Sequence, residues 1–243
     1  MAKKKIVALI CCRGNSKGVP NKNLKNFAGR PILYWTYKAI SQSKLFDEIF
    51  ISTDSKKINN MAQKIGYHST GLRPSKLALD NSDQFRTHNY VFNKMKINDK
   101  NSLVCIVNNS PFITKKNLRK TYDLFKSGNF NIITTDAAEV STDFQYYKQG
   151  YMKKNKLEFK FKNKFKKSRI NRQSNENLFV NIFNIRWGKP SQLNSYNNFK
   201  KTLINDGNYF IKISKKFLFD IDDMEDWYLA EKIFKVLRND KYI

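Results

Sequence analysis

KIVALICCRGNSKGVPNKN, residues 5 to 23, joins an apolar, β-branched run to a loop that is rich in glycine and positive charge. The run at 5–11 has the composition of a buried strand. The loop that follows contains two glycines together with Arg13, Lys17 and Lys22. In an open parallel sheet, ligands bind beyond the carboxyl ends of the strands, and the loop after the first strand is a common phosphate site. The stretch therefore predicts an α/β fold with an anion-binding loop.

The rest of the chain alternates strand-like and helical patterns. Further apolar, β-branched runs lie at 48–53, 103–107, 131–135, 178–185 and 209–213. Helical patterns with suitable capping residues lie at 31–44, 55–65, 80–95, 114–128 and 223–239. Strands that alternate with helices form a mainly parallel sheet with helices on both faces.

The length and composition indicate one folded domain. The chain has 243 residues, of which 40% are hydrophobic and 14% aromatic, enough for one sizeable core. The alternation breaks between about residues 140 and 178. We therefore expect a single domain over 1–243, with a basic inserted arm at about 140–178.

The net charge of +26 by itself suggests a polyanion partner such as nucleic acid. Lysines are nevertheless spread along the whole chain, and the main concentration is at 153–173, where ten basic residues face only Glu158. Phe159, Phe161 and Phe165 alternate with lysines there. An amphipathic arm packed on the core or on a second subunit is the favoured interpretation, and nucleic-acid binding is the alternative.

No segment approaches the roughly 18 to 20 apolar residues of a membrane span, and the opening stretch turns polar at Arg13 before a signal-peptide pattern is complete. We expect a cytoplasmic protein with no membrane partner. Cys11, Cys12 and Cys105 lack metal-ligand or disulfide spacing, so we interpret them as small core hydrophobes. The two histidines, His68 and His88, are expected on the surface without a role.

The loop after the first strand matches neither of two common phosphate-binding motifs. Gly14 and Gly18 would let backbone N–H groups approach an anion, and the basic side chains would neutralise it. No Gly-Lys-Ser/Thr ends the loop, and its glycines do not have the dinucleotide spacing. A solvated basic turn is the alternative.

A second polar feature, FDIDDMEDW, lies at 219–227. Asp220 and Asp222 alternate in an extended segment, so both carboxylates should face one side while Ile221 faces the core. Two such carboxylates suit a Mg²⁺ ion that also holds phosphates. The alternative is that Asp222 or Asp223 caps the last helix; Asp220 lies too far upstream for that.

RGNSKGVPNKN at 13–23 resembles the N-terminal signature of the acylneuraminate (CMP-sialic acid) cytidylyltransferases, approximately R-x-x-S-K-G-[LIV]-P-x-K-N. Four further blocks agree in the family's order: ISTDS at 51–55, LRPSKLALD at 72–80, NSPF at 109–112 and FDIDDMEDW at 219–227. The resemblance implies a Rossmann-like nucleotidyltransferase fold and a homodimer in which a late inserted arm reaches over the partner. It also implies transfer of CMP from CTP to a nine-carbon α-keto acid sugar, with release of pyrophosphate.

The resemblance implies a role for individual residues of this chain as well. Asn23 would approach the ribose and Arg73 the cytosine, while Asp220 and Asp222 would ligate Mg²⁺. Arg13 and Lys17 would be catalytic, because they stabilise charge on the α-phosphate and the departing pyrophosphate during in-line attack. The triphosphate would lie on the first loop, at Arg13, Gly14, Ser16, Lys17 and Lys22.

The sequence departs from the family on the sugar side. Val107 stands where relatives carry a glutamine, Asn109 stands at a threonine position, and the late strand near Asn181 lacks a glycine. We expect these three residues to line the sugar site. A legionaminic-type, pseudaminic-type or N-acetylneuraminic acid is equally compatible, an eight-carbon Kdo-type acid less so. A catalytically silent CTP-binding homologue is a further alternative.

Overall fold

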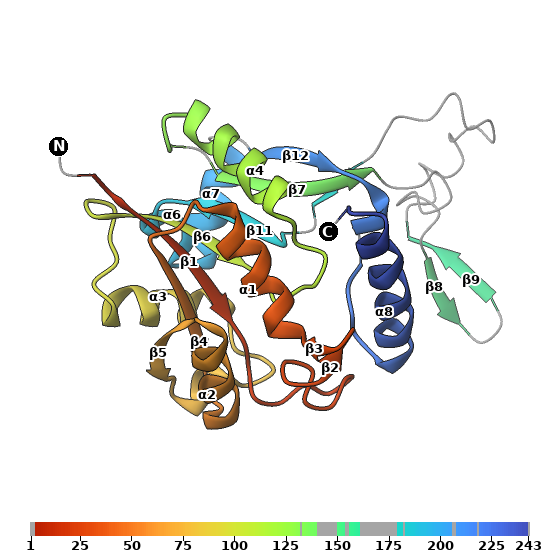
Figure 1. Ribbon diagram of the computed structural model, residues 1–243. Coiled ribbons are helices and arrows are strands. Elements are labelled where there is room, and N and C mark those ends of the chain that lie inside the picture. Colours follow the sequence, from red (N-terminus) through yellow and green to blue (C-terminus); the bar gives the residue numbers. More distant parts are fainter. Residues whose placement is uncertain are drawn as a thin grey trace.

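The computed structural model describes residues 3–131, 133–139, 150–153, 156–160, 179–181, 183–205, 208–217 and 219–242. A mixed sheet of eight strands forms its centre, in the order β10-β7-β11-β6-β1-β4-β5, with β12 also paired to β7 (Figure 1). These strands are β1 (Lys5–Cys11), β4 (Glu48–Thr53), β5 (His68–Leu72), β6 (Ser102–Val107), β7 (Ile133–Glu139), β10 (Phe179–Asn181), β11 (Ile185–Gly188) and β12 (Asn208–Ile213).

The sheet is parallel from β6 through β1 and β4 to β5, and it is mixed at the other edge. β1 pairs in parallel with both β4 and β6, and β4 pairs in parallel with β5. β11 runs antiparallel to β6, and β10 runs antiparallel to β7. The predicted α/β fold with a mainly parallel sheet is confirmed. Because parallel strands end at one edge, the loops after β1, β4 and β6 meet there.

One predicted strand proved wrong. The apolar run at 178–185 forms two separate strands, β10 and β11, rather than one. Phe183, between them, has a left-handed backbone with φ of 55°. The N–H of Ile185 donates to the Asp136 carboxylate at 3.1 Å, which fixes the start of β11.

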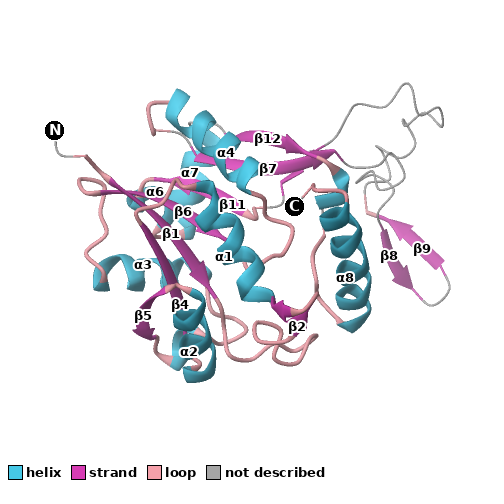
Figure 2. Ribbon diagram, in the orientation of Figure 1, coloured by secondary structure: helices cyan, strands magenta, loops and turns pink. Residues whose placement is uncertain are grey.

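Helices cover both faces of the sheet (Figure 2). One face is covered by α1 (Ile32–Ser43), α2 (Lys56–Ile65) and α4 (Lys115–Ser127). The other face is covered by α3 (Gln84–Lys94), α6 (Pro190–Leu193) and α7 (Tyr196–Asn205). The Ser55 and Thr114 side chains cap α2 and α4 as their sequences predict.

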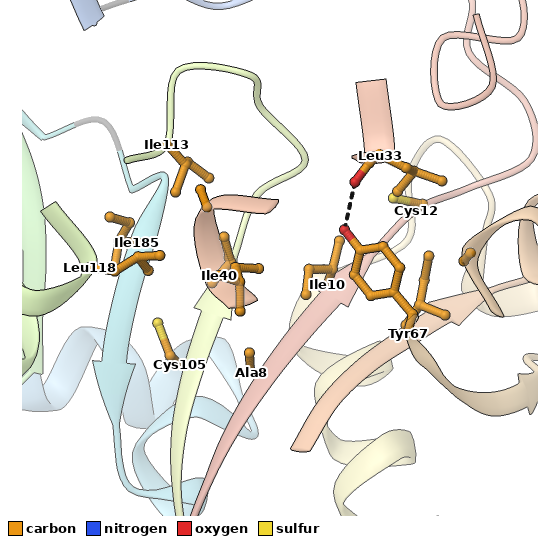
Figure 3. Packing of buried hydrophobic residues seen from close by; sticks show 14 of the residues in the cluster. Ala8, Ile10, Cys12, Leu33, Ile40, Tyr67, Cys105, Ile113, Leu118 and Ile185 are labelled. Atoms are coloured by element: carbon orange, nitrogen blue, oxygen red, sulfur yellow. Dashed lines mark hydrogen bonds between the residues drawn. The ribbon is translucent and has the colours of Figure 1, made fainter. Parts of the chain in front are cut away.

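The core of the first face brings alternate strand residues against α1 and α4 (Figure 3). Ala8 and Ile10 of β1 and Cys105 of β6 all lie in this layer, and each is fully buried. The Tyr67 hydroxyl is buried with them and donates to the Leu33 carbonyl at 3.0 Å (Figure 3). Cys12 is buried as well, so the interpretation of these cysteines as core residues is confirmed for Cys12 and Cys105.

The last helix, α8 (Met224–Asn239), packs beside α1 and a short hairpin, β2 (Asn26–Phe27) and β3 (Arg30–Pro31). The Trp227 ring meets the Phe27 ring edge-on at 5.2 Å. Val19 and Ile221 are buried in the same cluster. This cluster therefore holds the loop after β1 and the segment before α8 against each other.

The expected arm lies largely outside the described residues. Within it, β8 (Gly150–Lys153) and β9 (Lys156–Phe159) form an antiparallel pair separate from the main sheet. Phe161 and Phe165 are not described, so the amphipathic arm and its nucleic-acid alternative stay predictions. The single-domain organisation also stays a prediction. None of the described helices is both long and apolar enough to cross a membrane.

Candidate active site

Two neighbouring pockets open at the carboxyl edge of the parallel strands. The larger, which we call the loop pocket, has a volume of about 460 Å³, and the smaller, the arginine pocket, about 250 Å³. They share Cys11, Arg13 and Asn108. The predicted site residues that line the loop pocket are Arg13, Ser16, Lys17, Lys22, Asn23, Asn109, Asp220 and Asp222.

The loop after β1 is fastened against the segment before α8. A Cβ atom at Gly18 would lie 1.6 Å from the Asp222 carbonyl oxygen, so only glycine permits this approach. The Lys22 ammonium donates to the Ile221 carbonyl at 2.5 Å. The basic loop and the two aspartates, far apart in the sequence, therefore form one pocket.

Gly14 is hydrogen-bonded to the residue that follows β4. Its N–H donates to the Asp54 carboxylate at 2.9 Å, so this donor is already used within the protein. Gly14 also does not line either pocket. The prediction that Gly14 contacts the triphosphate stays a prediction; in this structure the residue anchors the loop to the end of β4.

Arg13 and Lys17 both pair with Asp80. The Arg13 Nη1 lies 2.5 Å from Asp80 Oδ1, and the Lys17 Nζ lies 2.6 Å from Asp80 Oδ2. The Lys17 hydrogen bond, followed by the charges of Lys17 and Arg13, lowers the pKa of Asp80. These pairs are exposed, and exposed ion pairs contribute little free energy, so a polyphosphate can displace the carboxylate.

A chain of hydrogen bonds through Asn109 and Asn23 links Thr36 to the backbone of the loop. The Asn23 amide donates to the Arg13 carbonyl at 2.9 Å, and the Asn109 amide donates to Asn23 Oδ1 at 2.8 Å. The Thr36 hydroxyl in turn donates to Asn109 Oδ1 at 2.8 Å. Asn109 thus positions Asn23 and the loop, besides lining the pocket.

The acidic segment has the predicted alternation. Asp220 and Asp222 line the loop pocket, and Ile221 between them is buried. Asp223, not Asp222, caps α8 by accepting from the Asp226 N–H at 2.9 Å. Two carboxylates beside a basic loop fit Mg²⁺, which takes one or two carboxylates plus phosphate oxygens. No group of three or more metal-ligating side chains occurs within the described residues, so a bound metal would need oxygens from the substrate or water.

Arg73 lines the arginine pocket, and its predicted contact with the cytosine stays a prediction. Arg73 is 7% exposed, its backbone N–H donates to the Thr53 carbonyl at 2.9 Å, and its Nη2 lies 3.7 Å from Asp54 Oδ1. Val107 lines the same pocket. Arg186 lines this pocket too, although the sequence analysis did not single it out. The sequence feature that could have indicated it is a charged residue within an otherwise apolar strand.

Asn181, expected on the sugar side, is directed elsewhere. It accepts from the Phe183 N–H at 3.1 Å and donates to the Thr135 hydroxyl at 2.8 Å. It lines neither of the two pockets, whereas Asn184 lines the loop pocket. The displaced position follows from the turn that separates β10 from β11, so its role in sugar binding stays a prediction without support from the pocket geometry.

His88 is buried rather than exposed, which corrects the prediction from its helical pattern. It is 1% exposed and its Nδ1 lies 3.1 Å from the Leu193 carbonyl. Burial, followed by the nearby Arg186 charge, lowers the pKa of His88 to about 3. The imidazole is therefore neutral at physiological pH, and Nδ1 is the donor to the carbonyl. His68 does lie at the surface, paired with Glu48.

A family model described as cytidylyltransferase matches residues 7–216, most of the chain. The chain belongs to the cytidylyltransferase family. This confirms the resemblance that the ordered blocks indicated. The match covers the basic loop and the lining of the arginine pocket, and it ends before the acidic segment at 219–222.

Curated relatives share this family. The chain is 32% identical to a CMP-N,N'-diacetyllegionaminic acid synthase of Legionella pneumophila over 54% of the chain and 57% of that protein. It is 27% identical to a pseudaminic acid cytidylyltransferase of Campylobacter jejuni over 68% of the chain and 71% of that protein. Against an N-acylneuraminate cytidylyltransferase of Oncorhynchus mykiss, identity is 28% over 61% of the chain and 34% of that protein. The chain thus spans about a third to just over half of the length of two of these relatives.

Among solved structures, the chain is similar to a CMP:2-keto-3-deoxy-manno-octonic acid synthetase in complex with CTP. The TM-score is 0.69, with coverage of 98% of this chain and 100% of that one. The sequence identity is 14%, so this likeness concerns the fold alone. It confirms the Rossmann-like nucleotidyltransferase fold.

Proposed function

We propose that this protein transfers the CMP group of CTP to a nonulosonic, sialic-type acid and releases pyrophosphate. The observation that carries the proposal is the contact of Gly18 with the Asp222 carbonyl, which joins a basic loop and two carboxylates in one pocket. The relatives named above, which act on legionaminic, pseudaminic and N-acylneuraminic acids, support the substrate class.

In this scheme the triphosphate occupies the loop pocket and the base occupies the arginine pocket. Arg13 and Lys17 leave Asp80 for the phosphates, while Lys22 remains fixed against the acidic segment. The two pockets meet at Arg13, so this guanidinium lies where the nucleoside and its phosphates join. Charge neutralisation and positioning then supply most of the catalysis.

The chemical step is an in-line displacement at the α-phosphorus. The anomeric hydroxyl oxygen of the acid forms the new bond to the α-phosphorus, the bond from that phosphorus to the bridging oxygen of pyrophosphate breaks, and the hydroxyl proton passes to water. Arg13 and Lys17 stabilise the charge that collects on the α-phosphate and on pyrophosphate. Mg²⁺, when held by Asp220 and Asp222, would supply further charge neutralisation at the phosphates.

The homodimer and the cytoplasmic location belong to the same proposal, and the panel of acids described below identifies the acid. Assembly with a second copy is supported by the inserted arm that the family resemblance implies. It is also supported by two exposed apolar residues, Phe179 of β10 and Phe210 of β12. CTP and an acidic nine-carbon sugar are the expected small-molecule partners.

The proposal is tested by measuring pyrophosphate release from CTP and Mg²⁺ over a panel of nonulosonic acids and Kdo, with the product mass determined. Release with one acid is expected. The Asp220→Asn, Asp222→Asn double variant should lose at least about a thousandfold in kcat, as expected when transition-state charge neutralisation is removed. Glu225→Gln, an exposed acid in the first turn of α8, serves as the control and should retain activity. Silence over the whole panel by a folded, CTP-binding protein would contradict the proposal.

A further inference from the structure

A third cavity, distinct from the two pockets of the candidate active site, lies between α1, the start of α4 and the end of α8; the three helices can be followed in Figure 1. We call it the helix pocket. Its volume is about 410 Å³, close to the roughly 460 Å³ of the loop pocket. The two cavities share Pro111, so they are neighbours. The scheme proposed above makes no use of the helix pocket.

The lining of the helix pocket is strongly basic. Within the described part of the chain no acidic residue lines it. In the loop pocket, Arg13 and Lys17 share the Asp80 carboxylate. The helix pocket has no such counter-ion, because none of its five cations forms an ion pair or a side-chain hydrogen bond with a described residue. These cations are Lys38, Lys115, Lys116, Arg238 and Lys241.

Two of the cations lie at the positive end of a helix. Lys115 and Lys116 occupy the first turn of α4, which contains no acidic residue. The partial positive charge of a helix N-terminus adds to that of the two ammonium groups. An anion in the helix pocket would therefore interact favourably with the lysine side chains and with the helix dipole together.

The rest of the lining is largely aromatic and apolar. Trp35 of α1 and Phe234 of α8 are buried, with ring centroids 5.0 Å apart. Tyr242 is 55% exposed, and its backbone N–H donates to the Leu237 carbonyl at 2.9 Å, which holds it at the end of α8. The Arg238 guanidinium lies 4.5 Å from the Trp35 ring centroid. Flat apolar surface and unpaired cations thus meet in one cavity.

A nucleotide has both properties that this lining would recognise. Its phosphates suit lysine and arginine side chains, and its base can stack on an aromatic ring or on a guanidinium plane. The similar volumes of the helix pocket and the loop pocket indicate room for one nucleotide. The basic segment at 153–173 of a second copy is a poor occupant, because it would add like charges to the five already present.

We propose that the helix pocket binds a second nucleotide, a nucleoside di- or triphosphate. Its phosphates lie against the lysines at the start of α4 and against Lys38 and Lys241, and its base lies against Tyr242 and the apolar part of the lining. This site is separate from the one that holds CTP in the proposed function. The inference therefore goes beyond that function and can be tested without turnover.

The test measures binding by calorimetry in a full-length background variant, Arg13→Gln, Lys17→Gln, which lacks two cations of the loop pocket. CTP that still binds to this background reports the helix pocket. The probes are CTP and its two halves, cytidine and tripolyphosphate. A 12-nucleotide RNA is the fourth probe, because a strand would also use cations and aromatic rings.

The decisive variant adds Lys115→Gln, Lys116→Gln to the background. Its matched control adds Lys56→Gln, Lys57→Gln, because these exposed lysines occupy the first turn of α2 as the other pair does in α4. The control pair lines neither the helix pocket nor the two pockets of the candidate active site. A third variant, Tyr242→Ala, removes the exposed ring of the lining.

We expect the background to bind one CTP per chain. Lys115→Gln, Lys116→Gln should raise Kd for CTP at least about tenfold, because hydrogen bonds between charged groups are lost. The control should stay within about twofold, since its charges are distant and screened. CTP should bind at least about tenfold more tightly than either half, as two contacts of this size predict. Tyr242→Ala should weaken CTP at least about fivefold and leave tripolyphosphate within about twofold.

Four results would overturn the inference. The background could bind no CTP, or the substitutions at α4 and at α2 could weaken CTP equally, which would leave only the general field of a basic protein. Tripolyphosphate could bind as tightly as CTP, which would remove the role of the base. The RNA could bind at least about tenfold more tightly than CTP and lose that affinity in the α4 variant, which would assign the cavity to a nucleic-acid strand.

Discussion

Replacing Gly18 by alanine is the sharpest test of how the loop pocket is built. The added Cβ would lie 1.6 Å from the Asp222 carbonyl oxygen, whereas real Cβ contacts essentially never fall below 3.0 Å. The loop and the acidic segment must therefore separate by about 1.4 Å or more. A misplacement of about 1 Å in an active site can cost about a hundredfold in rate.

We accordingly expect Gly18→Ala to lower kcat/KM for CTP about a hundredfold, equivalent to about 2.7 kcal/mol of transition-state stabilisation. Gly18 itself is exposed, so circular dichroism should show a folded protein. Gly14→Ala is the matched control, because its Cβ would meet Ser55 at 3.0 Å, a contact that small shifts relieve. The control should lose no more than about threefold in kcat/KM by the same scale. Gly18→Ala activity within threefold of the wild type would refute the claim that this contact sets the geometry.

Three further predictions concern electrostatics and packing. Asp80→Asn should tighten the binding of CTP about two- to fivefold at low ionic strength, because Arg13 and Lys17 are freed, and calorimetry in 1 M salt should find the gain abolished. Phe234→Ala should lower the free energy of unfolding by about 3–5 kcal/mol in urea titrations, since this fully buried ring meets Phe27 and Trp35 at 5.2 and 5.0 Å; a loss below about 1 kcal/mol would contradict that packing. His88 has a folded pKa of about 3, below its usual 6.5, so acid protonates the unfolded chain first and destabilises the wild type. The unfolding free energy of His88→Asn relative to the wild type should therefore rise by about 1.4 kcal/mol per pH unit as the pH falls from about 6 to 4, and a flat difference would count against a neutral folded His88.

The sequence predicted the loop pocket well because its determinants are local. A basic, glycine-containing loop directly after a strand has its position fixed by that strand, and alternation in an extended segment orients Asp220 and Asp222. These patterns need no knowledge of the partners across the fold. The capping residues Ser55, Thr114 and Asp223 were predictable for the same reason.

The arginine pocket was harder to predict because its residues meet only through the tertiary fold. Arg186 occupies an apolar strand, and nothing near it in the sequence indicates that Gln84 and Asn108 will orient it. His88 has polar neighbours on its helix, yet it faces Leu193, which is far away in the chain. The break near Phe183 depends on a hydrogen bond from Ile185 to Asp136, another contact that periodicity does not encode.

The contact between the loop after β1 and the segment before α8 joins residues that the ribosome makes at very different times. Lys22 and the Ile221 carbonyl that it binds are 199 positions apart. An emerging chain can thus build the β1, β4 and β5 end of the sheet early, but it cannot complete the pocket until synthesis has passed Asp222. Any product of premature termination before that point would carry the basic loop without its acidic counterpart, and so could attract nucleotides without being able to process them.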